Sequence, residues 1–433
     1  MIIADAALEK REQARRPIRV GIAGAGYIAR GIACQLLKKP VGLRLAAISN
    51  RTISRAEQVL RDGGLDHFPR VNSVREMEDC ISRGEVAVTE DPTLLCDASN
   101  VDVIIEATSD MEYGARVVLR AIDGGKHVVL LNAALDSTVG PYLKTLADRK
   151  KVVITYTDGE EPGVAMNLFR FVKTIGYKPV GAGNLKGLLD HYRNPDTQRA
   201  FAERIKASPF MVTSFADGTK LAMECTILAN STGLRAGKRG MYGPKCAHVN
   251  EISKLLPQDQ LMEGGLVDFA LGAEPHTGAF VIGFNENPVN KEYMGAFKMG
   301  DGPFYVFYTP YHLPQLQINH TIARAALFHD PTTSPIGKPV CEVLTLAKRD
   351  LRAGEILDGI GGFASYALIE NSDVAQSERS LPMGLSEGCR LKRDISKDQA
   401  ITYDDVEVPA GRLCDKLRAE QDQYFSAAVT ANQ

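Results

Sequence analysis

The sequence lacks several features by which whole classes of protein are recognised. No apolar run approaches the ~18 residues that a membrane-spanning helix needs, and residues 9–12 put charges where a signal peptide requires an apolar core. The net charge of −2 gives no reason to expect nucleic acid or an anionic membrane as a partner. Because G-x-S-x-G, P-loop and basic-aromatic patterns are also missing, hydrolase, NTPase and nucleic-acid functions have no local support.

The spacing of the cysteines does not indicate a metal site or a redox motif. The eight cysteines are scattered, with no C-x-x-C pair and no spacing typical of zinc ligands. We therefore expect reduced thiols and a cytoplasmic protein. Apolar residues make up 44% and charged residues 24% of the 433 positions, which is ordinary for a globular chain of two or three domains.

A glycine motif stands near the start of the chain, between an expected strand and an expected helix. The strand covers 17–23, and the letters G-x-G-x-x-A follow at once. Gly24 permits a tight turn and Gly26 lets the backbone approach a pyrophosphate, which would rest on the helix N-terminus. In this strand-turn-helix context the motif predicts a dinucleotide site that includes Gly24, Gly26, Tyr27 and Ile28.

The end of the next strand indicates which dinucleotide is bound. The strand covers 43–49 and is followed by Asn50, Arg51 and Thr52, with no acidic residue for the ribose hydroxyls. A guanidinium between two neutral hydrogen-bonding side chains suits a 2′-phosphate. We therefore predict NADP(H) in preference to NAD(H). The alternative is that Arg51 only forms an ion pair on the surface.

Further strand and helix patterns alternate over the first 160 residues. The expected strands cover 86–88, 101–107, 126–131 and 152–157. Thr108 and Ser109, after one strand, are expected to pass the nicotinamide, and Asn132 follows the next strand before a helix over 137–149. This alternation predicts an α/β fold with a Rossmann-type doubly wound parallel sheet.

Acidic residues follow the last of these strands. Asp158 and Glu160 are two positions apart, so in extended backbone their side chains would leave the strand on the same face. Two neighbouring anions repel unless a cation or a proton lies between them, and a hard divalent metal would serve. The alternative is an acidic loop that caps a helix over 164–175.

A second polar group lies on an expected helix over 219–228. Lys220 and Glu224 are four positions apart and share one helical face, and Asn230 lies near the helix end. The other side chains of this helix are apolar all round, so we expect it to be buried. A buried lysine–glutamate pair is costly and indicates function, whereas an exposed pair would be an ordinary surface salt bridge.

A polar run between 184 and 194 could bind a substrate phosphate. Lys186 would supply charge, and His191 and Asn194 would donate hydrogen bonds. A single histidine is, however, often a structural group. The glycine-rich segment 278–302 could form a lid, and a plain β-hairpin is the alternative.

The second half of the chain predicts a different architecture. We expect a strand over 179–187, helices over 196–207 and 315–328, and several strands within 269–308. These predict an α+β domain whose sheet provides a face for oligomerisation. The phrase K-R-D-[LI] then occurs twice, at 348–351 and 392–395, in a segment that resembles the small β-rich SAF module. A helix over 413–427 follows.

Two enzyme families are similar to parts of this chain. Gly-Lys-His-Val-Val at 125–129 with Asn132, and the 217–228 stretch, resemble homoserine dehydrogenase. Asp-Gly-Glu at 158–160 is similar to the metal motif of deoxyxylulose-phosphate reductoisomerase, in which a glutamate on a later helix completes the site. Ala133 stands where both families have a lysine, and there is no tryptophan for the flap of the reductoisomerase.

Taken together, these features resemble the reductoisomerase-like (DRL) family of bacterial isoprenoid biosynthesis. The resemblance implies NADPH- and Mg²⁺- or Mn²⁺-dependent conversion of 1-deoxy-D-xylulose 5-phosphate to 2-C-methyl-D-erythritol 4-phosphate. Asp158, Glu160 and Glu224 would bind the metal, and Lys220 and Asn230 would orient hydroxyls. Two alternatives stay open: a homoserine-dehydrogenase-type oxidoreductase acting on a small aldehyde, and a non-catalytic NADP-binding sensor or carbohydrate-binding protein.

These expectations define four parts of the chain and its partners. We expect an N-terminal arm (1–16), an NADP-binding domain (17–160), a catalytic α+β domain (161–339) and an SAF-like domain with a final helix (340–433). The expected partner is a small sugar phosphate, without nucleic acid or membrane. We expect a homodimer or a homotetramer.

Overall fold

The computed structural model describes residues 4–430, and their side chains up to 427. The chain divides into two compact units. The first contains the residues up to Glu160, Leu313–Ser334 and the chain from Leu413 on, and the second contains Glu161–His312 and Pro335–Arg412. The chain passes from the first unit to the second after Glu160. Residues 335–412, which hold most of the segment expected to form a separate domain, belong to the second unit, and the final helix belongs to the first.

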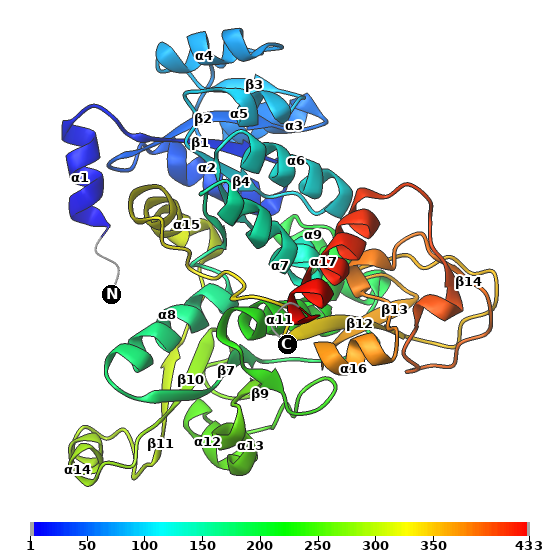
Figure 1. The fold of residues 1–433 in the computed structure, drawn as a ribbon. Helices are drawn as coiled ribbons and strands as arrows, with labels where there is room; N and C mark the ends of the chain where they lie inside the picture. Colours follow the sequence, from blue (N-terminus) through cyan, green and yellow to red (C-terminus); the bar gives the residue numbers. More distant parts are fainter. Residues whose placement is uncertain (1–3, 431–433) are drawn as a thin grey trace. The chain divides into compact units, whose positions relative to one another are not determined.

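The first unit is built on a six-stranded, fully parallel sheet with the order β3-β2-β1-β4-β5-β6 (Figure 1). Its strands are β1 Ile18–Ala23, β2 Leu43–Ser49, β3 Ala87–Thr89, β4 Val103–Glu106, β5 His127–Leu130 and β6 Ile154–Tyr156. The order reverses between β1 and β4, which is the switch point where doubly wound sheets bind ligands. The predicted Rossmann-type fold is confirmed.

Helices cover this sheet because their apolar faces pack against its buried β-branched strands. The helices of the first unit are α1 Asp5–Gln13, α2 Tyr27–Leu37, α3 Ile53–Asp62, α4 Val74–Ser82, α5 Thr93–Asp97, α6 Met111–Asp123, α7 Ala133–Arg149, α15 Pro314–Ala323 and α17 Leu413–Thr430. Of these, α1 buries no residue, and α17 packs on α6 and α7. Ile318 and Ile322 of α15 are buried in the same core as β1 and α2. Glu112 of α6 caps α17, since its carboxylate accepts the backbone N–H groups of Leu413 and Cys414, each at 2.8 Å. These contacts explain why two late segments belong to the first unit.

The second unit contains a mixed five-stranded sheet with the order β11-β10-β7-β9-β8. Its strands are β7 Lys178–Lys186, β8 Arg235–Ala236, β9 Leu266–Leu271, β10 Ala279–Phe284 and β11 Phe304–Thr309. The helices are α8 Glu161–Thr174, α9 Pro195–Ile205, α10 Pro209–Ala216, α11 Thr219–Thr232, α12 Ile252–Leu255, α13 Gln258–Glu263, α14 Pro288–Ala296 and α16 Ser372–Ser377. The predicted α+β architecture is confirmed. Within 278–302 the alternative of a β-hairpin is the better one, because β10 and β11 pair antiparallel, with α14 in their connection.

The repeated K-R-D-[LI] phrase has a structural explanation. The segment around it carries two short antiparallel pairs, β12 Cys341–Ala347 with β13 Ser365–Asn371, and β14 Arg390–Leu391 with β15 Val406–Glu407. The two copies of the phrase bind each other reciprocally. The bonds run from Leu351 N to Ile395 O (2.9 Å), from Ile395 N to Leu351 O (3.0 Å), from Lys397 N to Asp350 Oδ1 (2.8 Å) and from Ala353 N to Asp394 Oδ1 (2.9 Å).

Two remaining expectations concern the described chain as a whole. Among residues 4–430, no helix is both long enough and apolar enough to cross a membrane. All eight cysteines lie in this part of the chain, and each has a free thiol, as expected from their spacing.

Candidate functional site

The glycine motif lies between β1 and α2, at the switch point of the first sheet. Gly24 has a φ of +115°, and a Cβ atom there would lie 2.7 Å from the carbonyl oxygen of Ala107. Gly26 precedes α2, has no side chain to cap the helix, and leaves room where a Cβ would meet no described atom within 4 Å. Tyr27 and Ile28 begin the helix. The turn is therefore tight on one side and open on the other, as a pyrophosphate site requires.

Arg51 lies in the loop after β2 and contacts the start of α6. Its Nη2 lies 3.2 Å from Oδ2 of Asp110, and its guanidinium stands 5.1 Å from the centre of the Tyr113 ring. The side chain is 66% exposed, so it remains accessible to a ligand. Asn50 donates from Nδ2 to the carbonyl oxygen of Thr52 at 2.9 Å, which shapes the loop.

A buried carboxyl group that the sequence did not single out organises the loop after β4. Glu106 is fully buried and accepts a hydrogen bond from the backbone N–H of Thr108 at 2.9 Å. Burial raises the pKa of Glu106 to about 7, although hydrogen bonds from Thr108 and Asn132 oppose the shift. Asn132 also caps α7, since its Oδ1 accepts from Leu135 N at 3.1 Å. Ser109 follows Thr108 in the same loop.

Asp158 has a different role from the one that the sequence predicts. β6 ends at Tyr156, and Asp158 occupies the turn that follows, so the argument from extended backbone does not apply. Its carboxylate is fully buried, with Oδ1 3.1 Å from Nη1 of Arg324 and Oδ2 3.0 Å from Oγ1 of Thr321. Thr332 also donates to Oδ2. Because both oxygens are engaged by protein groups, Asp158 does not fit a metal ligand.

The second unit brings together five ionisable side chains, which we call the charged cluster. They are Glu161 of α8, Lys186 of β7, Lys220 and Glu224 of α11, and His312. Lys186 Nζ lies 2.8 Å from Oε1 of Glu161 and 3.5 Å from Oε2 of Glu224. Lys220 Nζ lies 3.3 Å from Oε1 of Glu224, and His312 Nε2 lies 3.7 Å from Oε2 of Glu161. The predicted pair of Lys220 and Glu224 is therefore present.

Both carboxylates of the cluster are buried, with side-chain exposures of 5% for Glu161 and 0% for Glu224. Burial raises the pKa of Glu161, but Lys186, His312 and Lys220 outweigh it, so the pKa lies below its usual range. Burial lowers the pKa of Lys186, but Glu161 and Glu224 outweigh it, so the pKa lies above its usual range. Glu161 and Lys186 are therefore charged at neutral pH.

Oxygen atoms in the cluster offer places for a ligand. One carboxylate oxygen of Glu161 and one of Glu224 lie within 4.8 Å of each other. Asn184 donates from Nδ2 to Oε2 of Glu224 at 2.9 Å. Oδ1 of Asn184 and Oε2 of Glu161 are both buried and accept no hydrogen bond from the described residues. Two carboxylates and an amide oxygen are hard ligands, which suit Mg²⁺ or Mn²⁺. Glu160, also buried, directly precedes Glu161 in the chain.

Three other predicted residues have structural roles. The Oδ1 atom of Asn230 accepts from Val340 N at 2.7 Å and from Cys341 N at 3.1 Å, so it supports the start of β12 and does not join the cluster. Asn194 caps α9 by accepting from Thr197 N at 3.0 Å. His191 contacts Asp217 O through Nδ1 at 2.8 Å and stacks on Tyr366. Lys186, His191 and Asn194 each bind different partners, so the phosphate site predicted from them stays a prediction.

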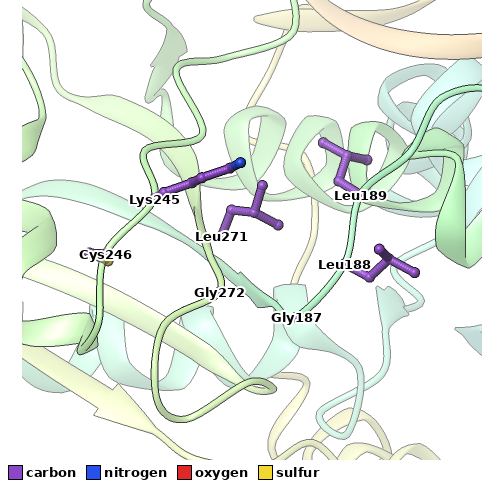
Figure 2. A pocket seen from close by; sticks show the side chains of 7 residues that line it. All are labelled: Gly187, Leu188, Leu189, Lys245, Cys246, Leu271 and Gly272. Atoms are coloured by element: carbon purple, nitrogen blue, oxygen red, sulfur yellow. The ribbon is translucent and has the colours of Figure 1, made fainter.

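A cavity of about 500 Å³ begins directly after Lys186 at the end of β7. It is lined by Gly187, Leu188, Leu189, Lys245, Cys246, Leu271 and Gly272. Figure 2 shows Lys245 on one wall, with its ammonium group directed toward the space that Leu188 and Leu189 face from the opposite wall. Among the described residues, no carboxylate lines the cavity, so Lys245 gives it a positive character.

Comparisons with known proteins divide the chain at the same place. Residues 24–157 match the NAD-binding domain of homoserine dehydrogenase, and residues 159–318 match the catalytic domain of oxidoreductase DRL. The chain thus combines an NAD(P)-binding domain with a segment similar to an oxidoreductase catalytic domain, as the resemblance implied.

Individual relatives are distant. The homoserine dehydrogenase of Neisseria gonorrhoeae is 24% identical over 157 residues, which are 34% of this chain and 31% of that protein. That of Pseudomonas aeruginosa is 24% identical over 149 residues, with the same coverages. The chain therefore matches less than a third of the length of these relatives. The solved homoserine dehydrogenase from Thiobacillus denitrificans is 16% identical, covers 89% of this chain and 97% of its own, and has a TM-score of 0.40.

Replacing Arg324 by methionine tests the role of Asp158. The variant would leave a buried carboxylate without its cation, and we expect it to lower the free energy of unfolding by about 3–5 kcal/mol. The matched control is Arg120→Met, which removes an exposed pair with Asp97 and is expected to cost about 1 kcal/mol or less. Urea unfolding followed by circular dichroism measures both. Equal stabilities of the two variants would contradict a structural role for the Arg324–Asp158 pair.

The raised pKa of Glu106 predicts how stability depends on pH. The pKa of this carboxyl rises from 4.5 to about 7 on folding, so the folded state holds a proton that the unfolded state releases, and stability falls as the pH increases between these values. Complete deprotonation costs about 3 kcal/mol. We expect Glu106→Gln to remove most of this loss between pH 5 and pH 8, whereas the exposed control Glu90→Gln keeps it. An identical pH slope in both variants would be inconsistent with a buried, protonated Glu106.

Proposed function

We propose that this protein is an NADPH-dependent and divalent-metal-dependent reductoisomerase that converts 1-deoxy-D-xylulose 5-phosphate to 2-C-methyl-D-erythritol 4-phosphate. The observation that carries the proposal is the charged cluster. Its members Glu161, Lys186, Lys220, Glu224 and His312 all belong to the segment that matches the DRL catalytic domain. A protein that buries so many ionisable groups in one place bears a large desolvation cost, and such clusters concentrate at functional sites.

The proposed cofactor is NADPH. The tight turn at Gly24 and the open space at Gly26 support a bound pyrophosphate. Arg51 supports recognition of the 2′-phosphate, because it is exposed and held beside Asp110 and the ring of Tyr113. A guanidinium braced in this way can form paired hydrogen bonds to a phosphate.

The proposed metal ligands differ from those that the sequence alone suggested. We assign Mg²⁺ or Mn²⁺ to Glu161 and Glu224, with Oδ1 of Asn184 as a further oxygen and Glu160 as the neighbouring carboxylate in sequence. We do not assign Asp158 as a ligand, because its carboxylate oxygens are bound by Arg324, Thr321 and Thr332. When bound, the metal would polarise the vicinal carbonyl and hydroxyl groups of the substrate.

The other members of the cluster have roles that follow from their positions. Lys220 lies beside Glu224 at the exposed side of the pair and would stabilise negative charge that develops on a substrate oxygen. Lys186 bridges the two carboxylates and would keep them ionised and in place. His312, next to Glu161, would donate or accept a proton at the site.

The cavity after Lys186 is the proposed site of the substrate phosphate. Its lysine, Lys245, faces a space without carboxylates, whereas Lys186 is already neutralised by two of them. The proposal places the sugar phosphate between the cavity and the cluster, because the cavity begins at Gly187, the residue after Lys186 of the cluster. We also propose that the protein forms a homodimer or a homotetramer, with the mixed sheet as one candidate face.

One observation favours a second candidate function. The ammonium group of Lys186 already stands between Glu161 and Glu224, so the cluster can be electrically balanced without a metal. A metal-independent oxidoreductase of the homoserine dehydrogenase type, with Lys220 and Glu224 in proton transfer, would use such a site. A non-catalytic NADP-binding sensor would turn over neither substrate.

Glu224→Gln tests the proposed metal site. We expect kcat for NADPH oxidation with 1-deoxy-D-xylulose 5-phosphate to fall by about 10²- to 10³-fold, because glutamine lacks the negative charge that would hold the metal and that pairs with Lys220. Mn²⁺ binding, measured by calorimetry, should weaken at least about tenfold, while NADPH affinity stays unchanged.

The exposed Glu203 of α9 provides the control, since Glu203→Gln should change none of these quantities. EDTA should abolish wild-type turnover. Activity that survives EDTA and appears only with aspartate semialdehyde would support the dehydrogenase, and turnover of neither substrate would support the sensor.

Arg51→Asp tests the choice of NADPH. Loss of the guanidinium and gain of an anion should lower the ratio of NADPH to NADH affinity by tenfold or more, since one charged hydrogen bond contributes about 1.5–3 kcal/mol. Arg75→Asp makes the same charge change on an exposed position of α4 and should leave the ratio unchanged. Fluorescence titration with both nucleotides measures it, and an unchanged ratio in Arg51→Asp would refute the assignment of the 2′-phosphate.

A further inference from the structure

The direction of α11 is set by a sharp elbow at residues 216–219. α10 ends at Ala216, Asp217 follows, and Gly218 has a φ of +90°, which strongly favours glycine. α11 begins at Thr219, so Lys220 lies in its first turn and Glu224 one turn later. A small rotation at the elbow would therefore displace Lys220 and Glu224, the two members of the charged cluster that α11 carries.

Lys348 binds this elbow from the first K-R-D phrase. Its ammonium group lies 3.0 Å from Oδ2 of Asp217, 2.7 Å from the carbonyl oxygen of Arg193 and 2.7 Å from that of Gly362. Three acceptors match the three N–H donors of a lysine. The side chains of Lys348 and Asp217 are only 4% and 0% exposed. The ammonium group of Lys348 thus binds the elbow, the loop before α9 and the turn before β13 at the same time.

Other contacts hold the elbow in the same orientation. The Oδ1 atom of Asp217 accepts from Thr219 N at 2.9 Å, which fixes the first residue of α11. The Oγ1 atom of Thr219 accepts from Ala367 N of β13 at 3.2 Å. His191 contacts Asp217 O at 2.8 Å and stacks on Tyr366 of β13, with ring centres 4.6 Å apart. The elbow is therefore bound on several sides to the segment that carries the K-R-D phrases.

The second copy of the phrase shows that a buried lysine is not needed for the repeat itself. Lys392 occupies the same position in that copy and is exposed. Asp350 and Asp394, by contrast, make equivalent bonds in both copies. Since dehydrating an ion pair costs several kcal/mol, the burial of Lys348 requires a reason beyond the pairing of the two phrases.

We infer that Lys348 is a positioning residue for the charged cluster: by fixing the elbow, it sets the place of Lys220 and Glu224. The SAF-like segment then has a definite part in the activity, because it supplies the clamp for the helix that carries these groups. This inference rests on the proposed function of the cluster, whereas the clamp itself is a property of the fold that can be measured without turnover.

Lys348→Met and Lys392→Met form a matched pair of variants. Hydrogen–deuterium exchange should become about tenfold faster or more for the amides at the start of α11 in Lys348→Met, while β11, the edge strand of the mixed sheet, keeps its protection. With 1-deoxy-D-xylulose 5-phosphate, kcat should fall by about 10²-fold, the loss expected for a displaced catalytic group. The dissociation constant for NADPH should stay within about twofold. Lys392→Met should match the wild type in every measurement.

The outcomes separate a positioning role from a general structural one. Uniformly faster exchange across the second unit, or wild-type exchange and kcat in Lys348→Met, would overturn the inference. If Lys348→Met does not fold, the double variant Asp217→Asn/Lys348→Met replaces it, because it removes both buried charges. This variant still lacks the hydrogen bonds from Lys348 to Arg193 and Gly362. Its amides at the start of α11 should therefore exchange faster as well. If the wild type has no reductoisomerase activity, the proposed function fails, and the exchange of α11 alone decides whether Lys348 holds the elbow.

Discussion

The need to neutralise buried carboxylates is the constraint on which both units depend. A carboxylate removed from water loses several kcal/mol of hydration, and it persists in charged form only with a nearby cation and enough hydrogen-bond donors. The main pairs are Asp158 with Arg324 in the first unit, and Asp217 with Lys348 and Glu161 with Lys186 in the second. In each pair the partners are far apart in sequence, so each unit forms the pair only when its elements are correctly assembled.

These pairs differ in whether they leave an oxygen atom without a protein donor, to which a ligand could bind. The oxygens of Asp158 and Asp217 are engaged by protein donors on both sides, which makes these pairs structural. At the charged cluster, two buried oxygens, Oε2 of Glu161 and Oδ1 of the adjacent Asn184, accept no hydrogen bond from the described residues. A polar atom left in this way costs free energy unless something binds it. The cluster is therefore the place in the second unit where chemistry with a ligand is best supported.

The sequence predicts what is determined locally and fails where the partners are distant. The Rossmann sheet and the Lys220–Glu224 pair follow from strand patterns, a glycine motif and helical spacing, all of which lie within short windows. Asp158 was misjudged because its partner Arg324 comes from a helix late in the chain. Asn194 was misjudged because a helix cap and a phosphate ligand use the same residue types. Asn184 begins the polar run that the sequence assigned to a substrate phosphate, but its hydrogen bond to Glu224 was not predicted. Its place two residues before Lys186 in β7 puts both side chains on one face of the strand.

The duplicated K-R-D phrase shows how a repeat can acquire a role outside itself. Its aspartate and its leucine or isoleucine are used in both copies for the reciprocal bonds that join them. The lysine takes no part in this pairing, so its environment can differ between copies without disturbing the fold. One copy leaves it in solvent, and the other buries it against Asp217 at the start of the helix that bears Lys220 and Glu224. Because hydrogen bonds between the two phrases fix the backbone next to Lys348, its ammonium group can orient the elbow more closely than a lysine on an unpaired loop could.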